Sequence, residues 1–140
     1  MTVTVHHLNN SRSQRILWLL EELNTDYDIV PYQRDAETNL APPELKQVHP
    51  LGKSPLIEDN GLQVAESGAI IQYLCERHGG GSWLPEADTE DHVRHLEWMQ
   101  FGESSFFVPV MLKLYTGRLG DAAAALAPRI DEQLAAQAGS

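Results

Sequence analysis

The pair Asn60-Gly61 constrains the fold of this chain more than any other short segment. It separates two four-residue runs, 56–59 and 62–65, which contain two and three apolar residues. Asn-Gly between such runs is the strongest short-range signal for a β-hairpin with a two-residue turn, because both positions of that turn require a positive φ. The sequence therefore predicts two adjacent antiparallel strands in the middle of the chain.

The N-terminal segment combines a strand pattern with a helix pattern. Residues 2–8 predict a strand, with Val3, Val5 and His7 in one alternating row. A turn at 9–13 contains several residues that favour helix starts. The helix expected after it has apolar residues at helical spacing: Ile16, Leu19, Leu20 and Leu23.

The same alternation continues to the hairpin and beyond it. Residues 26–32 predict a second strand, and the prolines at 42–43 favour the start of a short helix. A third helix is expected to begin at 66–68. Its apolar stripe comprises Ile70, Ile71, Leu74 and Cys75. The predicted order of elements is βαβ, a helix, then ββα, which brings four strands together with three helices.

A change of pattern after the third helix indicates a second domain. Glycines at 79–81 end the helix, and the chain is purely helical in pattern from residue 88, with an alanine-rich helix expected over 122–138. Pro109 should kink or divide the long helix there. We therefore expect a domain over 1–80, a linker over 81–87 and a short all-α domain over 88–140.

Charge and cysteine content exclude several classes of function. Twenty acidic against ten basic residues give a net charge of −10, which disfavours binding to nucleic acid. No apolar run is long enough to cross a membrane, and the single cysteine, Cys75, excludes an internal disulfide or a cysteine metal site. His92 and His95 are three residues apart on an expected helix, but without a third ligand they predict no metal. These features favour a cytoplasmic setting.

Ser11 is the first candidate for chemistry. It follows the first strand at the start of a helix, where unpaired N–H groups and a partial positive charge favour an anion. A hydroxyl there is placed to donate to a thiolate or an oxyanion. The alternative is a helix cap at Ser11 or at Ser13. No acid and histidine stand at a spacing that would make Ser11 a nucleophile.

Ser54-Pro55 is the second candidate, because proline readily accepts a cis peptide bond in a tight turn. A cis bond here would present the backbone of Ser54 to an extended ligand, as an added β-strand does. The alternative is an ordinary trans proline at the entrance to a strand.

Glu66-Ser67 is the third candidate and lies at the start of the third helix. Ser67 offers a hydroxyl and a helix N-terminal N–H to a carboxylate, whereas Glu66 can hold an ammonium group. The alternative is a helix cap with a favourable acid in the first turn.

Taken together, the motifs resemble those of the glutathione transferase family. The similarity is carried by 49–59, by 65–74 and by the serine-containing run 11–18, which is similar to serine-type bacterial and fungal members. The resemblance implies an α/β thioredoxin-like N-terminal domain, βαβ-α-ββα with a mixed four-stranded sheet. It also implies an all-α C-terminal domain that is longer in the family than 88–140 here.

The resemblance also implies a role for each candidate. Glutathione would be a co-substrate, with no metal. The main chain of Ser54, before a cis Pro55, would pair with its cysteine. Lys53 would face its glycine carboxylate, and Glu66 and Ser67 would hold its γ-glutamyl end.

The hydroxyl that the resemblance assigns to the sulfur maps to Ser11. We expect Ser13, about 200° further round the helix, to point away, and Asn10 is the reserve candidate. Phe106 and Tyr115 are candidates for an electrophile pocket, with a core position as the alternative.

The sequence therefore predicts a glutathione transferase that attacks apolar electrophiles, acting as a homodimer, as the resemblance implies. Two alternatives stay open. One is a glutathione-dependent disulfide reductase or peroxidase, and the other is a non-catalytic glutathione-binding module.

Overall fold

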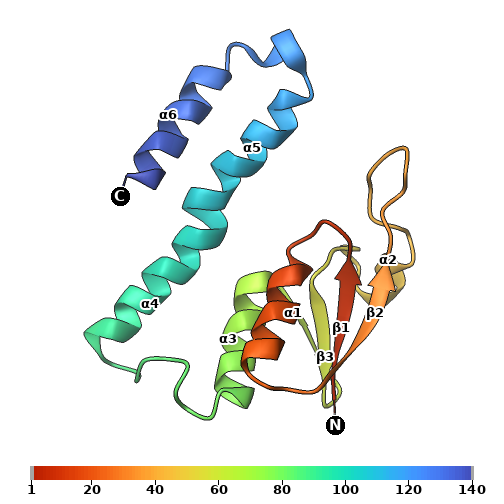
Figure 1. Ribbon diagram of the computed structural model, residues 1–140, viewed down its shortest axis with the longest axis vertical. Helices are drawn as coiled ribbons and strands as arrows, with labels where there is room; N and C mark the ends of the chain where they lie inside the picture. The colour runs from red at the N-terminus through yellow and green to blue at the C-terminus, as the bar shows by residue number, and fades with distance from the viewer. Residues whose placement is uncertain (1, 140) are drawn as a thin grey trace. The chain divides into compact units, whose positions relative to one another are not determined.

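The computed structural model describes residues 2–139, which divide into two compact units between Leu84 and Pro85. The first unit contains four strands and three helices (Figure 1). Its elements are β1 (Val3–Leu8), α1 (Ser13–Glu22), β2 (Tyr27–Tyr32), α2 (Leu45–Val48), β3 (Leu56–Asp59), β4 (Leu62–Ala65) and α3 (Ser67–His78). The predicted hairpin is confirmed, with both strands at the expected bounds and a positive φ at Asn60 and Gly61.

The strands form one mixed sheet in the order β2-β1-β3-β4. β1 pairs with β2 in parallel, whereas β3 is antiparallel to both β1 and β4. A parallel pair needs a crossover connection, which α1 supplies, and an antiparallel pair needs only the short turn at 60–61. This topology is thioredoxin-like and confirms the predicted fold.

The core of the first unit lies between the sheet and two helices. Alternation in β1 turns its valines toward α1 and α3, and i,i+4 pairs in each helix face them. The buried cluster comprises Val3, Val5, Ile16, Leu20, Ile57, Ile70 and Leu74. Each such side chain stabilises the fold by roughly 1.5–3 kcal/mol. Ile71, expected in the buried stripe of α3, is only partly buried at the edge of this cluster.

The second unit contains helical elements and no strand among its described residues. These are α4 (Glu90–Gln100), a π-helical segment η1 (Phe101–Phe106), α5 (Phe107–Gly117), a 3-10 turn η2 (Gly120–Ala123) and α6 (Ala127–Ala138). The long helix expected here is interrupted before Pro109, which is the third residue of α5 and lies in its first turn, where the missing N–H is tolerated. The change of helix type falls in the π-helical segment η1, which ends at Phe106, directly before α5.

The alanine-rich helix begins later than the sequence predicts. The expectation of one helix over 122–138 is wrong, since the first residues form the 3-10 turn η2 and α6 starts only at Ala127. Pro128 explains the difference. Proline is favoured in the first turn of a helix, where no N–H is needed, and is unfavourable inside one.

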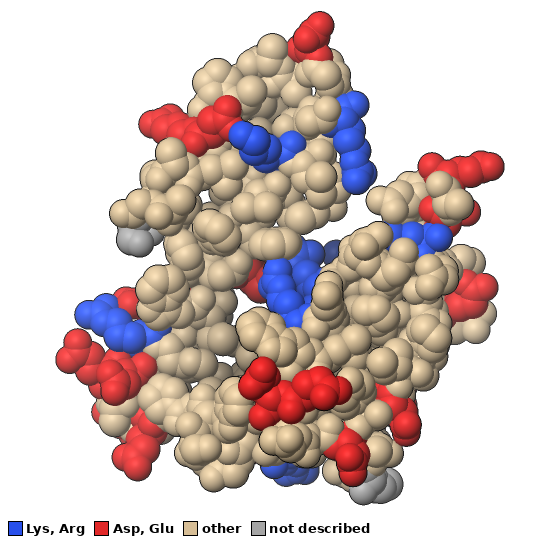
Figure 2. Space-filling model, viewed as in Figure 1, with Lys and Arg blue, Asp and Glu red and all other residues tan. Residues whose placement is uncertain are grey.

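Across residues 2–139, no helix has the length and apolar character needed to cross a membrane. Acidic side chains are distributed over the face shown in Figure 2 rather than gathered in one patch.

Candidate functional site

The register of the sheet brings the three candidate loops to one end of it. His6 of β1 pairs with Leu56 of β3, and Leu56 pairs with Ala65 of β4. One step further along the same edge come Pro55, before β3, and Glu66, after β4. Because β1 also leaves the sheet at this end, the Ser11 loop emerges beside them (Figure 1).

The loop before β3 is tied directly to β1 through Ser54. The Ser54 hydroxyl donates to the carbonyl of His6 (2.7 Å) and accepts from the N–H of Leu8 (3.2 Å). The Ser54-Pro55 peptide bond is cis, as predicted, and Pro55 is buried. Since the side chain of Ser54 is engaged by β1, its main chain is the part that is left to meet a ligand.

The start of α3 has the properties of an anion site. Ser67 is the first residue of α3 and is only 5% exposed. Its hydroxyl has no hydrogen-bond partner within the described chain. Glu66, before it, has φ +72° and makes no side-chain capping bond. A positive φ is uncommon for a residue with a side chain, and such conformations cluster at binding sites. The first N–H groups of α3 are thus left for a ligand.

The hydroxyls of Ser11 and Ser13 lie against each other, not apart. Their oxygens are 2.6 Å apart, and the N–H of Ser13 also donates to the Ser11 oxygen (3.1 Å). The expectation that Ser13 points away is therefore wrong. It assumed that both residues belong to the helix, whereas α1 begins only at Ser13 and Ser11 lies in the preceding turn.

Burial separates the two serines. Ser13 is 0% exposed, and its oxygen also contacts Nδ1 of His7 (2.7 Å) and the carbonyl of Leu8 (3.2 Å). Ser11 is only half-buried. Of the two hydroxyls, Ser11 is the one that a ligand can reach.

Arg34 braces the loop that carries Ser11, and sequence reasoning missed it. Its guanidinium donates to the carbonyls of Asn9 (3.0 Å), Asn10 (3.2 Å) and Asn39 (3.0 Å). The main-chain N–H of Arg34 donates to the side-chain oxygen of Asn9 (2.8 Å). A lone arginine between two elements carries no local signal for this role, because its partners are main-chain carbonyls. Asn10 itself is exposed and has φ +50°.

The remaining predicted residues have different surroundings. Lys53 is exposed beside the Ser54 loop. Phe106 and Tyr115 belong to the second unit, in η1 and α5, where the residues are 37% and 53% exposed. Neither is a buried core residue, which was the alternative reading of both.

Cys75 and the pair His92 and His95 carry the side chains that could serve in redox chemistry or bind a metal ion. Cys75 is buried, and burial raises the pKa of its thiol above the usual value, which disfavours the reactive thiolate. The His92 and His95 rings lie 6.2 Å apart on α4. Within residues 2–139, no three His, Cys, Asp or Glu side chains are grouped for a metal ion.

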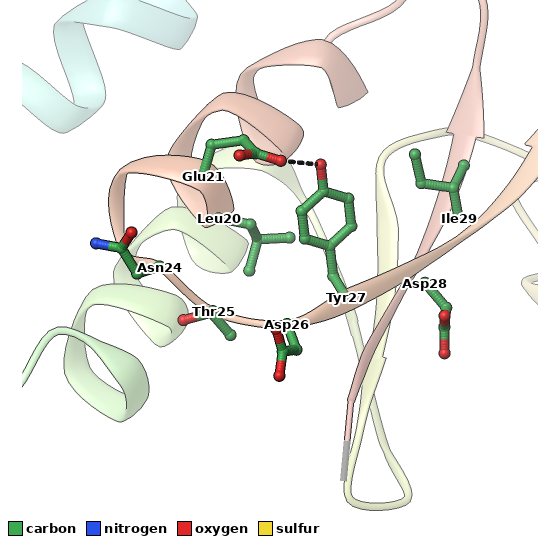
Figure 3. Close-up of a pocket in the computed structure, with 8 residues that line it drawn as sticks. All are labelled: Leu20, Glu21, Asn24, Thr25, Asp26, Tyr27, Asp28 and Ile29. Carbon is green, nitrogen blue, oxygen red and sulfur yellow. Dashed lines mark hydrogen bonds between the residues drawn. The ribbon is translucent and has the colours of Figure 1, made fainter.

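A separate hollow of about 640 Å³ lies at the other end of β1, where Val3 pairs with Tyr27 (Figure 3). Its lining includes Glu21, Asp26 and Asp28. The hydroxyl of Tyr27 donates to Glu21 (2.6 Å), and this bond raises the pKa of Tyr27. The hollow is acidic and far along the strand from the three loops, so it does not belong to the candidate site.

The topology and the cis-proline loop define the first unit as a thioredoxin-like domain. Residues 1–76 match the family described as "Glutathione S-transferase, N-terminal domain". The chain belongs to the glutathione S-transferase family, and the predicted family is thereby confirmed.

Two yeast relatives agree with this assignment. The chain is 40% identical over 127 residues to glutathione S-transferase 1 of Saccharomyces cerevisiae, covering 85% of this chain and 53% of the relative. It is 41% identical over 103 residues to glutathione S-transferase 3 of Schizosaccharomyces pombe, covering 74% and 42%. The chain thus spans about half the length of these relatives.

Solved structures show the same fold. A glutathione S-transferase from Actinobacillus pleuropneumoniae superposes with a TM-score of 0.82 at 34% identity, covering 97% of this chain and 62% of that one. Ure2p in complex with glutathione superposes with a TM-score of 0.81 at 21% identity, covering 99% and 65%. At that lower identity the similarity is one of fold.

Proposed function

We propose that this chain is a serine-type glutathione transferase in which Ser11 activates the thiol of bound glutathione. The observation that carries the proposal is the convergence of the Ser11, Ser54-Pro55 and Glu66-Ser67 loops at one end of the sheet. That arrangement offers an extended tripeptide a hydroxyl, a free main chain and a helix N-terminus within one surface.

The tripeptide is proposed to bind by matching charges. The γ-glutamyl carboxylate meets the N-terminus of α3 and the Ser67 hydroxyl, and its ammonium group meets the exposed carboxylate of Glu66. Lys53, exposed beside the site, pairs with the glycine carboxylate. The Ser54 main chain pairs with the central cysteine in the manner of a β-strand.

The chemistry then requires a thiolate. A free cysteine thiol has a pKa of about 8.5, so it is mostly protonated at neutral pH. A hydrogen bond from Ser11 and the positive end of α1 stabilise the anion, and each pKa unit of lowering corresponds to about 1.4 kcal/mol. The sulfur attacks an electrophilic carbon, the carbon–sulfur bond forms as the leaving group departs with its electron pair, and the thiol proton passes to solvent.

The electrophile is proposed to be apolar. Phe106 and Tyr115 are the candidate contacts, because both expose aromatic rings in the second unit. A single buried cysteine suits the reducing cytoplasm, which is the proposed location.

Calorimetric titration with glutathione, followed by turnover assays with an aromatic halide and with a mixed disulfide, tests the proposal. Binding together with turnover of the halide supports it. Turnover of the disulfide alone would identify a reductase, and binding without turnover would identify a binding module. Failure to bind glutathione would overturn all three functions.

Ser67→Ala should weaken glutathione binding by about 1–2 kcal/mol, because a buried carboxylate contact loses one hydrogen-bond donor. Titration calorimetry measures the change. Ser105→Ala, which removes an exposed hydroxyl from η1, is the matched control and should leave the affinity unchanged. If the wild-type protein, Ser67→Ala and Ser105→Ala all bind glutathione with equal affinity, Ser67 does not belong to the site.

We expect the protein to form a homodimer. α4 exposes three large apolar side chains, Val93, Leu96 and Trp98, and exposed apolar surface favours association. Sedimentation velocity over a concentration series should show a dimer. A single monomeric species at the highest concentration would contradict the expectation.

A further inference from the structure

A chain of three hydrogen-bonding side chains, His7, Ser13 and Ser11, runs from β1 to the proposed sulfur site. Nδ1 of His7 lies 2.7 Å from the Ser13 oxygen, which lies 2.6 Å from the Ser11 oxygen. His7 continues the row of β1 that begins with the buried residues Val3 and Val5, so it faces α1 rather than the far side of the sheet. Its ring thus meets the first residue of α1.

The short distance between the two serine oxygens means that one of them must donate to the other. A hydroxyl has one proton to donate and two lone pairs to accept with. Ser11 already accepts from the N–H of Ser13. If it also accepts the Ser13 proton, both of its lone pairs are occupied and its own proton is left to point outward.

This outward direction of the Ser11 proton requires a group that donates a hydrogen bond to the Ser13 oxygen. Once the Ser13 proton points to Ser11, the Ser13 oxygen must accept from Nδ1 of His7, which then carries a proton. In the opposite polarity, Ser13 donates to the carbonyl of Leu8 or to His7, and Ser11 donates inward to Ser13. A proton on Nδ1 therefore permits the outward polarity of the Ser11 hydroxyl, whereas an unprotonated Nδ1 takes the Ser13 proton and leaves Ser11 to donate inward.

We infer that His7 and Ser13 are positioning residues that direct the Ser11 proton toward the sulfur of glutathione. The inference rests on the proposed function of Ser11. Successive hydrogen bonds polarise one another, so the Ser11 hydroxyl becomes a better donor to an anion when it accepts two bonds.

A serine hydrolase pair does not explain the same contacts. A Ser–His contact of 2.7 Å has the geometry of a nucleophile and its base. However, Ser13 is 0% exposed, and its oxygen is surrounded by His7, Ser11 and the Leu8 carbonyl. No substrate carbon can reach it.

The first arm of the test uses the free protein. Long-range proton–nitrogen correlation spectra of the imidazole groups report which ring nitrogen of His7 carries a proton. We expect a proton on Nδ1. An unprotonated Nδ1 would overturn the inference even if glutathione binds and turns over normally.

The second arm measures the thiolate of bound glutathione by its ultraviolet absorbance at neutral pH. Ser13→Ala and His7→Leu should each lower the thiolate fraction about three- to tenfold, as expected for the loss of one supporting hydrogen bond. His7→Asn keeps an N–H near the position of Nδ1 and should restore most of the signal. Glutathione affinity should not change in any of the three variants.

The outcomes are distinguishable. If Ser13→Ala or His7→Leu keeps the wild-type thiolate fraction, the inference is overturned and the proposed function stands. The same conclusion follows if the thiolate fraction of His7→Asn is no higher than that of His7→Leu. Absence of glutathione binding in the wild-type protein would overturn the proposed function and the inference with it. If a variant does not fold, the imidazole spectra of the wild-type protein still test the inference, because an unprotonated Nδ1 would overturn it.

Discussion

Ser11→Ala should lower turnover of glutathione with an aromatic halide by about tenfold to a hundredfold. The reason is that one lost donor to a developing anion commonly costs that much or more. Glutathione affinity should change little, because the contacts proposed to hold the tripeptide come from the other two loops. Steady-state kinetics together with titration calorimetry separate the two effects.

The control and the competing assignments use neighbouring residues. Ser105→Ala should keep wild-type turnover. Full activity in Ser11→Ala combined with a loss in Asn10→Ala would transfer the role to the amide of Asn10. Full activity in both would leave the N–H groups at the start of α1 as the source of thiolate stabilisation.

Asp59→Ala should lower the free energy of unfolding of the first unit by about 3 kcal/mol. Asp59 is 1% exposed and accepts hydrogen bonds from Tyr73 (3.0 Å), His78 (2.9 Å) and Asn60 (3.1 Å). It therefore ties the hairpin to the last turn of α3, and its removal leaves the partner groups without an acceptor. Urea unfolding measures the loss, with Glu22→Ala, at an exposed position on α1, expected within about 0.5 kcal/mol of wild type.

The same residue predicts a dependence of stability on acid. Burial alone would raise the pKa of Asp59, but hydrogen bonds from His78 and Tyr73 and the charges of His78 and Arg77 outweigh it. The pKa therefore lies below its usual value of 3.8. A carboxyl group whose pKa is lowered by folding contributes its full stabilisation at pH values above its pKa in the unfolded chain. This contribution is lost as the pH falls through its pKa in the folded protein. In Asp59→Asn the decline of stability below about pH 4 should be shallower, and equal slopes would contradict this account.

Local signals in the sequence were sufficient for most of the first unit. The hairpin follows from Asn60-Gly61 alone, because the turn type and the alternating runs depend only on adjacent residues. The core faces of α1 and α3 follow from helical spacing in the same way. The order of elements then leaves few ways to pair the strands.

Spacing along the chain does not by itself give the direction of a side chain in space. The prediction that Ser13 turns away from Ser11 requires both residues to be helical, but α1 starts two residues later, at Ser13, and the two oxygens lie 2.6 Å apart. The start of α6 was missed for a related reason. Alanine content favoured a helix over the whole segment, whereas Pro128 restricts where its first turn can lie.

The sequence by itself determined the family, the thioredoxin-like fold and the three loops that carry the proposed site. It did so because turns, helix starts and apolar periodicity depend on neighbouring residues. Only the tertiary structure decided which side chains meet across the chain. The bonds of Arg34 to three carbonyls, of Ser54 to β1 and of His7 to Ser13 join residues from different elements. Such contacts depend on the register of the strands and the packing of α1, and a one-residue shift in that register would turn His7 to the opposite face of the sheet.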